Sequence, residues 1–265
     1  MEADLLLCAC NSLKRGERMR MLILTAAVLM AATGAEAVDW LYAIDGDYLY
    51  DVDPSDGDWT SLSSSWTGTE LMTSCQGYLF AIHGDVLYLV DPDDGAWESL
   101  SSTWEGANAL TASPYSLYAC QNGIIYEVDP SDGNWASIPG DYEGTQFMAW
   151  AGGALMVIQN DVLYRTDPDT GDFTELPSSY SGVTAVAGCS SSLFVVQGDI
   201  LYKVDPYSGE YTNLGGGYSG VREMAFGNGY VYSIWEGSLW MTDPDNGDYA
   251  GLTESWDGCT AFCSL

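Results

Sequence analysis

Short runs of hydrophobic and aromatic residues alternate with Gly, Asp, Asn and Pro along most of this chain. Between Thr69 and Leu100, four such runs of four to seven residues are each bounded by turn-forming residues. Runs of this length that are rich in Tyr, Val, Ile, Leu and Trp are typical of strands joined by tight turns. No segment after residue 37 has a sustained hydrophobic period of 3.6 residues with capping residues, so no helix is predicted there.

The pattern of four runs occurs six times. An Asp-Pro pair marks each copy and begins 38 residues after the pair before it, at Asp53, Asp91, Asp129, Asp167, Asp205 and Asp243. A Gly follows three residues after each Pro, and an aromatic residue lies two residues after the Gly. Pro sets the first corner of a turn, the Asp side chain accepts from the amide two residues on, and Gly takes the left-handed position. This element is therefore predicted to be a structural turn and not a single active site.

The second run of each copy is hydrophobic at consecutive positions, as at Leu79 and Phe80, so both faces of that strand need cover. In a closed ring of sheets each sheet lies between two neighbours, which supplies that cover without the polar end caps of an open stack. Residues 259–265 form an unaccompanied first strand, and the other three strands of that sheet start at Trp40. We predict an all-β fold: a six-bladed β-propeller of four-stranded blades, closed by the C-terminal strand completing the N-terminal blade.

Two short elements resemble known propeller repeats. Residues 128–135, Val-Asp-Pro-Ser-Asp-Gly-Asn-Trp, resemble the quinoprotein-like repeat, and the aromatic-x-Gly element that begins at Trp66 is similar to the tectonin-type lectin repeat. The even spacing over residues 38–265 is similar to that of bacterial secreted tandem-repeat propellers. The chain departs from quinoprotein dehydrogenases, which have eight blades and adjacent cysteines, and from sialidases, which need clustered arginines. The resemblance therefore implies the fold and not those activities.

The first 37 residues differ from the rest. Four basic residues between positions 14 and 20 precede an apolar stretch over residues 21–32, and residues 35–37, Ala-Glu-Ala, have the form of a cleavage site. The stretch is shorter than the roughly 20 residues of a membrane span. We predict a signal peptide over residues 1–37, with translation starting at Met1, Met19 or Met21. Residues 38–265 are then a single propeller domain, secreted or periplasmic.

The charge is strongly negative. The chain has a formal net charge of −31, and the basic residues after the leader are Arg165, Lys203 and Arg222. Nucleic acid and anionic membrane surfaces are excluded as partners, because both need a basic footprint. Five cysteines remain after the leader, an odd number without a C-x-x-C pair, so we predict small buried residues and neither a disulfide framework nor a zinc site.

The sequence has none of the common catalytic motifs, and its single histidine is His83. No cofactor is predicted. Weak calcium binding is left open for the first copy, with Asp51, Asp53, Asp56 and Asp58, although the Gly of this loop falls one position later than in an EF-type loop. Asp favours turns, so a structural role for these acids is preferred.

The candidate binding residues lie where the copies differ. We call positions 70, 108, 146, 184, 222 and 260 the first ring, and positions 45, 83, 121, 159, 197 and 235 the second ring. Positions 70 and 83 are equally far from the midpoint of the turn at residues 76–77, so the rings are predicted to pair side by side near one end of the central channel. The candidate ligand-binding residues are Glu70, Asn108, Gln146 and Arg222 of the first ring, and Asp45, His83, Gln121, Gln159, Gln197 and Trp235 of the second ring. Amides, carboxylates and an aromatic platform at Trp235 suit sugar hydroxyls or a peptide.

Three functions follow from these features. The preferred one is a secreted, non-catalytic binding or scaffold module that recognises glycan or extracellular protein through the channel-mouth face. The alternative is an extracellular hydrolase or lyase that uses acids at the mouth, such as Glu70, Glu223 and Asp45. The third is a structural subunit of an envelope or filament.

Overall fold

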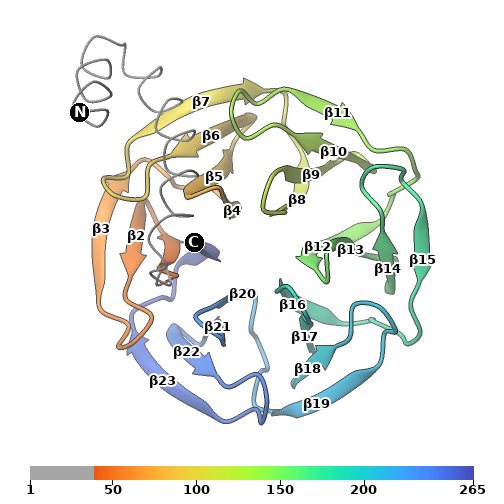
Figure 1. Cartoon of the computed structure of the whole chain (residues 1–265). Coiled ribbons are helices and arrows are strands. Elements are labelled where there is room, and N and C mark those ends of the chain that lie inside the picture. The colour runs from red at the N-terminus through yellow and green to blue at the C-terminus, as the bar shows by residue number, and fades with distance from the viewer. Residues whose placement is uncertain (1–38) are drawn as a thin grey trace, which may run out of the picture. The chain divides into compact units, whose positions relative to one another are not determined.

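The computed structural model describes residues 39–265, and every helix or strand in that range is a β-strand (Figure 1). The prediction of a helix-free domain is confirmed for this part of the chain. The predicted signal peptide lies outside the described residues. Within the described range, no helix is present that could cross a membrane.

The strands form six antiparallel sheets of four strands each. The first sheet contains β1 (Leu41–Asp45), β2 (Tyr48–Val52), β3 (Trp59–Ser64) and β24 (Cys259–Ser264). The second and third sheets contain β4 (Leu71–Cys75), β5 (Tyr78–His83), β6 (Val86–Val90), β7 (Trp97–Ser102), β8 (Ala107–Ala112), β9 (Leu117–Gln121), β10 (Ile124–Val128) and β11 (Trp135–Ser137). The fourth, fifth and sixth contain β12 (Thr145–Ala151), β13 (Ala154–Gln159), β14 (Val162–Thr166), β15 (Phe173–Glu175), β16 (Val183–Gly188), β17 (Leu193–Gln197), β18 (Ile200–Val204), β19 (Tyr211–Gly216), β20 (Glu223–Gly227), β21 (Tyr230–Trp235), β22 (Ser238–Thr242) and β23 (Tyr249–Glu254).

The six sheets stand around a central axis as the blades of a propeller (Figure 1). The innermost strands are β24, β4, β8, β12, β16 and β20, and the outer rim is formed by β3, β7, β11, β15, β19 and β23. The second strand of each blade is buried along almost its whole length, as predicted from its two hydrophobic faces. The core therefore lies between blades: Ile44 of β1 packs in one cluster with Leu79 of β5.

The ring closes through the chain's last strand. β24 pairs antiparallel with β1, with Leu41 opposite Ser264 and Ala43 opposite Phe262. The order β24-β1-β2-β3 within this sheet confirms the predicted closure. Because β24 joins the first sheet from the far end of the chain, no blade is left with an unpaired innermost strand among the described residues.

The Asp-Pro-x-x-Gly element is a turn with the predicted hydrogen bonds in all six copies. Each Asp Oδ1 accepts from the backbone amide two residues on, at 2.8–2.9 Å. Each Gly has a φ between 66° and 80° and donates its amide to the carbonyl of the same Asp. The turns also touch the preceding blade: a Cβ at Gly247 would collide with the carbonyl oxygen of Leu214 on β19. Glycine is therefore required here for both conformation and close approach.

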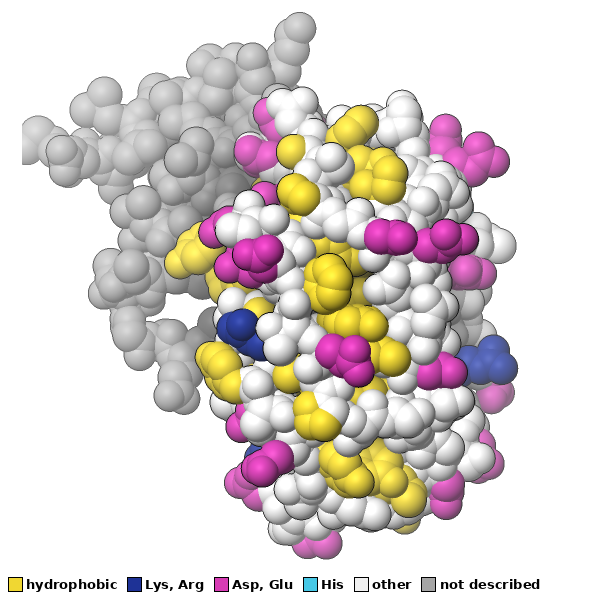
Figure 2. All heavy atoms as spheres, turned by 90° about the vertical axis from the view of Figure 1, so that its right-hand side faces the viewer, with side chains coloured by type: hydrophobic (Ala, Val, Ile, Leu, Met, Phe, Trp, Pro, Cys, Tyr) yellow, Lys and Arg dark blue, Asp and Glu magenta, His cyan; other side chains and the backbone are white. Residues whose placement is uncertain are grey.

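A row of aromatic residues follows the rim. One residue per blade is about half exposed on the outermost strand: Trp59, Trp97, Trp135, Phe173, Tyr211 and Tyr249. Each meets an inner aromatic ring edge-to-face, as Trp97 does with Tyr88 at 5.2 Å between ring centroids. Figure 2 shows hydrophobic side chains standing among acidic ones on the side of the molecule that carries β11 and β15. The aromatic that follows each turn therefore helps to pack the outer half of its blade.

Candidate functional site: the central channel

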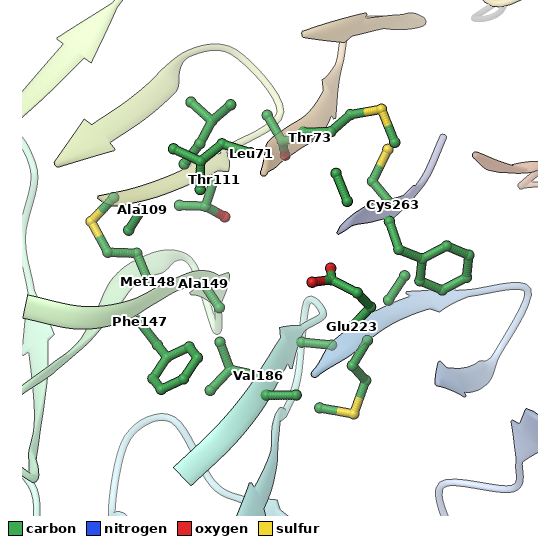
Figure 3. Close-up of a pocket in the computed structure, with 18 of the residues that line it drawn as sticks. Leu71, Thr73, Ala109, Thr111, Phe147, Met148, Ala149, Val186, Glu223 and Cys263 are labelled. Atoms are coloured by element: carbon green, nitrogen blue, oxygen red, sulfur yellow. The ribbon is translucent and has the colours of Figure 1, made fainter. Parts of the chain in front are cut away.

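The six innermost strands surround a cavity of about 330 Å³ that runs along the propeller axis. Each of these strands contributes four or five consecutive residues to its wall, from β4 round to β24. Figure 3 looks into this channel and shows side chains from different blades converging on it. A volume of this size lies at the lower limit for small-ligand pockets, so the channel can hold a side chain or small molecule but not a folded domain.

Four candidate residues of the first ring line one end of this cavity, and we call that end the channel mouth: Glu70, Asn108, Gln146 and Arg222. Glu70 and Arg222 are exposed. Asn108 Nδ2 donates to the carbonyl of Thr145 on the next blade at 2.7 Å, and Gln146 Oε1 accepts from the amide of Asp161 at 3.0 Å. The mouth therefore combines two exposed charges of opposite sign with two amides held by backbone contacts.

In four of the six blades the pairing predicted between the two rings is wrong by one residue, whereas Leu71 opposite Ile82 and Glu223 opposite Ile234 keep the predicted register in the other two. Gln121 faces Ala107 and not Asn108, because Asn108 is an extra residue in a β-bulge. The same shift places Gln159 opposite Thr145 and Gln197 opposite Val183. The bulge lies just after a tight turn, in which the amide of Ala107 donates to the carbonyl of Trp104 at 3.0 Å. The surplus residue of the strand is accommodated as the bulge.

The glutamines of the second ring hold the loops that enter their blades. Gln121 Nε2 donates to the carbonyls of Thr103 and Glu105, at 2.6 and 2.8 Å, in the loop that enters the same blade from its neighbour. Gln159 and Gln197 each bond two carbonyls of the corresponding loops in the same way. None of the three lines the channel cavity. Their side-chain amides are hydrogen-bonded within the protein, and ligand binding by these glutamines stays a prediction.

The remaining second-ring residues also have partners within the protein. Asp45 Oδ2 accepts from the amide of Gly258 at 3.1 Å, and His83 Nδ1 shares a hydrogen bond of 2.9 Å with Thr69 Oγ1. Trp235 stacks on Trp240, with ring centroids 4.6 Å apart and planes 20° apart. None of these residues is part of the cavity wall. The structure thus brings the first-ring candidates to the channel, whereas the second-ring residues have partners elsewhere in the fold.

Glu223, named above only for the alternative hydrolase, is the acid that lies deepest in the channel among the residues of its wall. It opens β20, and its carboxylate points into the channel in Figure 3. The other copies carry hydrophobic residues at this position: Leu71, Ala109, Phe147, Ala185 and Ala261. Burial, and secondarily the charge of Glu70, raise the pKa of Glu223 to about 8. The break in the hydrophobic pattern at this position was the sequence signal that could have identified it.

The far end of the channel carries two aromatic rings, Trp150 and Phe226, and no charged side chain in its wall. Trp150 of β12 stacks on Tyr118 with planes 2° apart, and Phe226 of β20 stacks on Phe194 with planes 5° apart. Gly188 of β16 lies so close to the backbone of Trp150 that a Cβ would collide with its carbonyl oxygen. Ser264 Oγ donates to the carbonyl of Phe226 at 2.6 Å and links two blades there. The channel is thus polar and charged at one end and packed with aromatic rings at the other.

The aspartates of the first turn are engaged in local hydrogen bonds. Asp53 Oδ1 accepts from both the amide and the hydroxyl of Ser55, and these bonds lower the pKa of Asp53. Asp56 Oδ1 accepts from the amide of Asp58 at 3.0 Å. Among residues 39–265, no three His, Cys, Asp or Glu side chains gather in a metal-binding arrangement. In this part of the chain the five cysteines are free thiols, three of them buried.

Comparison with known proteins bears on the fold. No protein-family model matches the chain, and a search of curated proteins found no match. Among solved structures, the chain is similar to one from a crystal structure of a nidogen/laminin complex, with a TM-score of 0.71 and 9% sequence identity. The similarity covers 85% of this chain and 98% of that one. At this identity it supports the six-bladed propeller and leaves the likeness to quinoprotein-like and tectonin-like repeats as a prediction.

Proposed function

We propose that this protein is a secreted, non-catalytic binding module that recognises a protein partner at the channel mouth. The observation that carries the proposal is the contrast between the two rings. The residues of the second ring serve the fold, whereas Glu70 and Arg222 of the first ring are exposed charges beside an open cavity. Residues that differ between copies and stand free at a cavity are candidates for recognition.

A protein partner is favoured over a glycan by two features. The mouth presents charges of both signs, which suits the mixed charges of a polypeptide better than the neutral hydroxyls of a sugar. The structurally similar propeller comes from a complex of two proteins. Three exposed tryptophans, Trp59, Trp97 and Trp135, lie on the outermost strands, and the fourth, Trp40, precedes β1, so none of them lines the channel.

A peptide-display selection tests the proposal. Peptides selected on the wild-type protein are measured again on Glu70→Ala and Arg222→Ala, with Trp97→Ala on the rim as the matched control. We expect at least tenfold weaker binding to one or both mouth variants and unchanged binding to the rim variant. Peptides that bind all three variants equally would overturn the proposal. If the wild type binds a glycan on an array and the mouth variants do not, the partner is a sugar and not a protein.

The proposed secretion rests on the leader pattern over residues 1–37. Expression of the full chain in a bacterial host with an export pathway should yield an exported protein whose amino-terminal residue is Val38. Amino-terminal sequencing of the exported fraction measures this directly. A protein that keeps residues 1–37 and stays inside the cell would contradict the assignment.

One observation favours the alternative hydrolase. The pKa of Glu223 is raised to about 8 while the charge of Glu70 acts on it, and a protonated acid beside a second carboxylate is the arrangement that glycoside cleavage uses. Asp45, the third acid of that prediction, does not line the cavity. The alternative requires turnover of a glycoside substrate that is abolished in both Glu223→Gln and Glu70→Gln. Activity that survives in either variant would exclude it.

A further inference from the structure

We propose that the channel is a socket for one cationic side chain, an Arg or Lys of an extended partner segment, which enters at the mouth and ends at the Glu223 carboxylate. This inference rests on the proposed function, because it names the chemistry of the segment that the mouth recognises.

The acid at position 223 is not required by the fold. Five other blades place Leu, Phe or Ala at the equivalent position of the same strand, and all five form the same four-stranded sheet. Glu223 faces Ile234 across its hairpin, the same pairing that Leu71 makes with Ile82. A carboxylate therefore replaces a hydrophobic residue without any change in the strand, which points to a role outside the fold.

The carboxylate has no counter-charge within the described part of the chain. The one salt bridge there joins Lys203 to Asp245 on the exposed surface, and Glu223 makes no ion pair. Arg222, its neighbour in sequence, lies at the channel mouth and forms no salt bridge with it. The channel wall includes Phe147 and Val186, which offer no hydrogen-bonding side chain, and the neutral hydroxyls of Thr73 and Thr111 (Figure 3). A partly buried acid in such surroundings gains most from a positive group brought in from outside.

The shape and lining of the channel suit a long side chain with a charged end. The cavity of about 330 Å³ holds a single such side chain and no larger body. Leu71, Phe147 and Val186 line it, and such hydrophobic side chains can pack against the methylene groups of Arg or Lys. At the mouth Glu70 adds a second negative charge and Arg222 one positive charge, so the charges of the channel sum to a negative value when Glu223 is ionised. Charge and shape thus both select a basic group.

Binding of a cation at this site is coupled to a proton. The pKa of Glu223 is about 8, so at neutral pH the empty site is largely protonated and a bound cation drives its proton off. Three titratable or charged groups face it: Glu70, which precedes β4, Arg222, which precedes β20, and Cys259 on β24. Burial and the charge of Glu223 raise the pKa of Cys259. From β8 and β12 the mouth residues are the neutral Asn108 and Gln146, and β16 supplies no titratable side chain to the wall. Affinity should therefore rise with pH up to about pH 8.

The test uses two blocked peptides that differ only in charge: acetyl-Gly-Arg-Gly-amide and its citrulline counterpart. Binding is measured by NMR titration at neutral pH and physiological salt on the wild type, on Glu223→Gln, and on Glu175→Gln, which removes an exposed acid of β15 as the matched control. We expect the wild type to bind the citrulline peptide at least tenfold more weakly than the arginine peptide. Glu223→Gln should bind the arginine peptide at least tenfold more weakly than the wild type, and Glu175→Gln should bind it as the wild type does. Affinity of the arginine peptide for the wild type should fall about tenfold per pH unit below the pKa of Glu223. Glu223→Ala repeats the measurement with the residue that three other blades carry at this position, which guards against a folding defect.

Three results would overturn the proposal. The wild type does not bind the arginine peptide, or Glu223→Gln binds it as well as the wild type does. The third is a loss of affinity in Glu175→Gln as large as that in Glu223→Gln, which would mean that the peptide is attracted by the net negative charge of the protein. The display selection separates this failure from failure of the proposed function. Selected peptides that lack basic residues and bind Glu223→Gln normally, yet lose binding in the Glu70 or Arg222 variants, refute the socket and keep the mouth as a protein-binding site. Selected peptides indifferent to the mouth variants refute the proposed function itself.

Discussion

At the scale of single residues, the six copies show which positions the fold needs and which it does not. Gly247 and its five equivalents stay glycine because the backbone is left-handed and the neighbouring blade leaves no room. Position 223 tolerates Leu, Phe, Ala or Glu. Internal comparison of this kind separates structural from functional residues within one chain.

Glu223 should make stability depend on pH. Its pKa in the folded protein, about 8, exceeds the value near 4.5 of an unburied Glu, so the folded state binds the extra proton and stability falls as pH rises between the two values. Glu223→Gln removes this dependence. We expect the variant to be more stable than the wild type by about 2 kcal/mol at pH 9, because solvent screening of the partly exposed carboxylate limits the effect. At pH 4.5 the two proteins should be about equally stable. Urea unfolding at both pH values measures the difference. Parallel pH profiles for the two proteins would show that Glu223 titrates normally.

Gly247 and Gly220 have similar backbone angles but different surroundings. Substituting each by Ala therefore separates the cost of the left-handed backbone from the cost of the collision with the neighbouring blade. Gly247 has a φ of 78° and Gly220 a φ of 89°, but a Cβ at Gly220 would meet no atom within 4 Å. Gly220→Ala should cost about 1 kcal/mol for the left-handed backbone alone. Gly247→Ala should cost at least about 3 kcal/mol, because the collision with Leu214 is added. Equal losses in urea unfolding would mean that the turns do not contribute to contacts between blades.

At the scale of elements, the second-ring glutamines act as ties between a blade and the loop that enters it. Gln159 on β13 bonds the carbonyls of Asp141 and Glu143, at 3.1 and 2.8 Å, in the loop before β12. The same role at positions 121 and 197 explains why three copies keep Gln there.

Loss of one tie should loosen its loop without unfolding the ring. Gln159→Ala removes two exposed hydrogen bonds and should cost about 1 kcal/mol. Hydrogen exchange of the amides of residues 141–145 should quicken, while those at the equivalent loop held by Gln197 stay unchanged. Gln159→Glu serves as a second variant, because an acid of the same shape would face two carbonyl oxygens and should loosen the loop further. Unchanged exchange in both variants would contradict the role as a tie.

The sequence alone was sufficient to predict the strands, the turns and the closure, because each is specified by a pattern repeated six times. In four blades the pairing of the two rings was not predictable by counting from the hairpin, since a bulge, as at Asn108, inserts a residue that the repeated pattern does not mark. Cavity lining depends on where side chains point after the blades pack, so Gln121 looked equivalent to Asn108 in the sequence although only Asn108 reaches the channel. Glu223 was readable in the sequence as an acid among five hydrophobic residues.

At the scale of the whole molecule, the dominant feature is charge. The chain carries a net charge of −31, and within the described residues one exposed salt bridge, between Lys203 and Asp245, offsets it locally. Exposed pairs of this kind contribute little to stability. The fold is therefore stabilised by hydrophobic burial between blades, which outweighs the repulsion among the acidic side chains.

Salt should stabilise this protein. Raising NaCl from 20 mM to 1 M screens the carboxylates and should raise Tm by roughly 5 °C or more at pH 7. Thermal unfolding followed by circular dichroism measures the shift. At pH 4, where many of the carboxylates are protonated, the same salt change should have a much smaller effect. A Tm that is independent of salt at pH 7 would mean that the acids are too far apart to repel one another.

The closure by β24 sets an order of events during protein synthesis. A ribosome makes the strand β1 early, yet the partner that covers its inner edge, β24, is the last strand to emerge. Blades two to six can each pair their four strands as soon as they leave the exit tunnel, whereas the first sheet must wait with three. Until β24 docks, the edge of β1 is free to pair with another nascent chain. Cells that make this protein must therefore carry each chain through a period in which its first sheet can exchange strands with a neighbour.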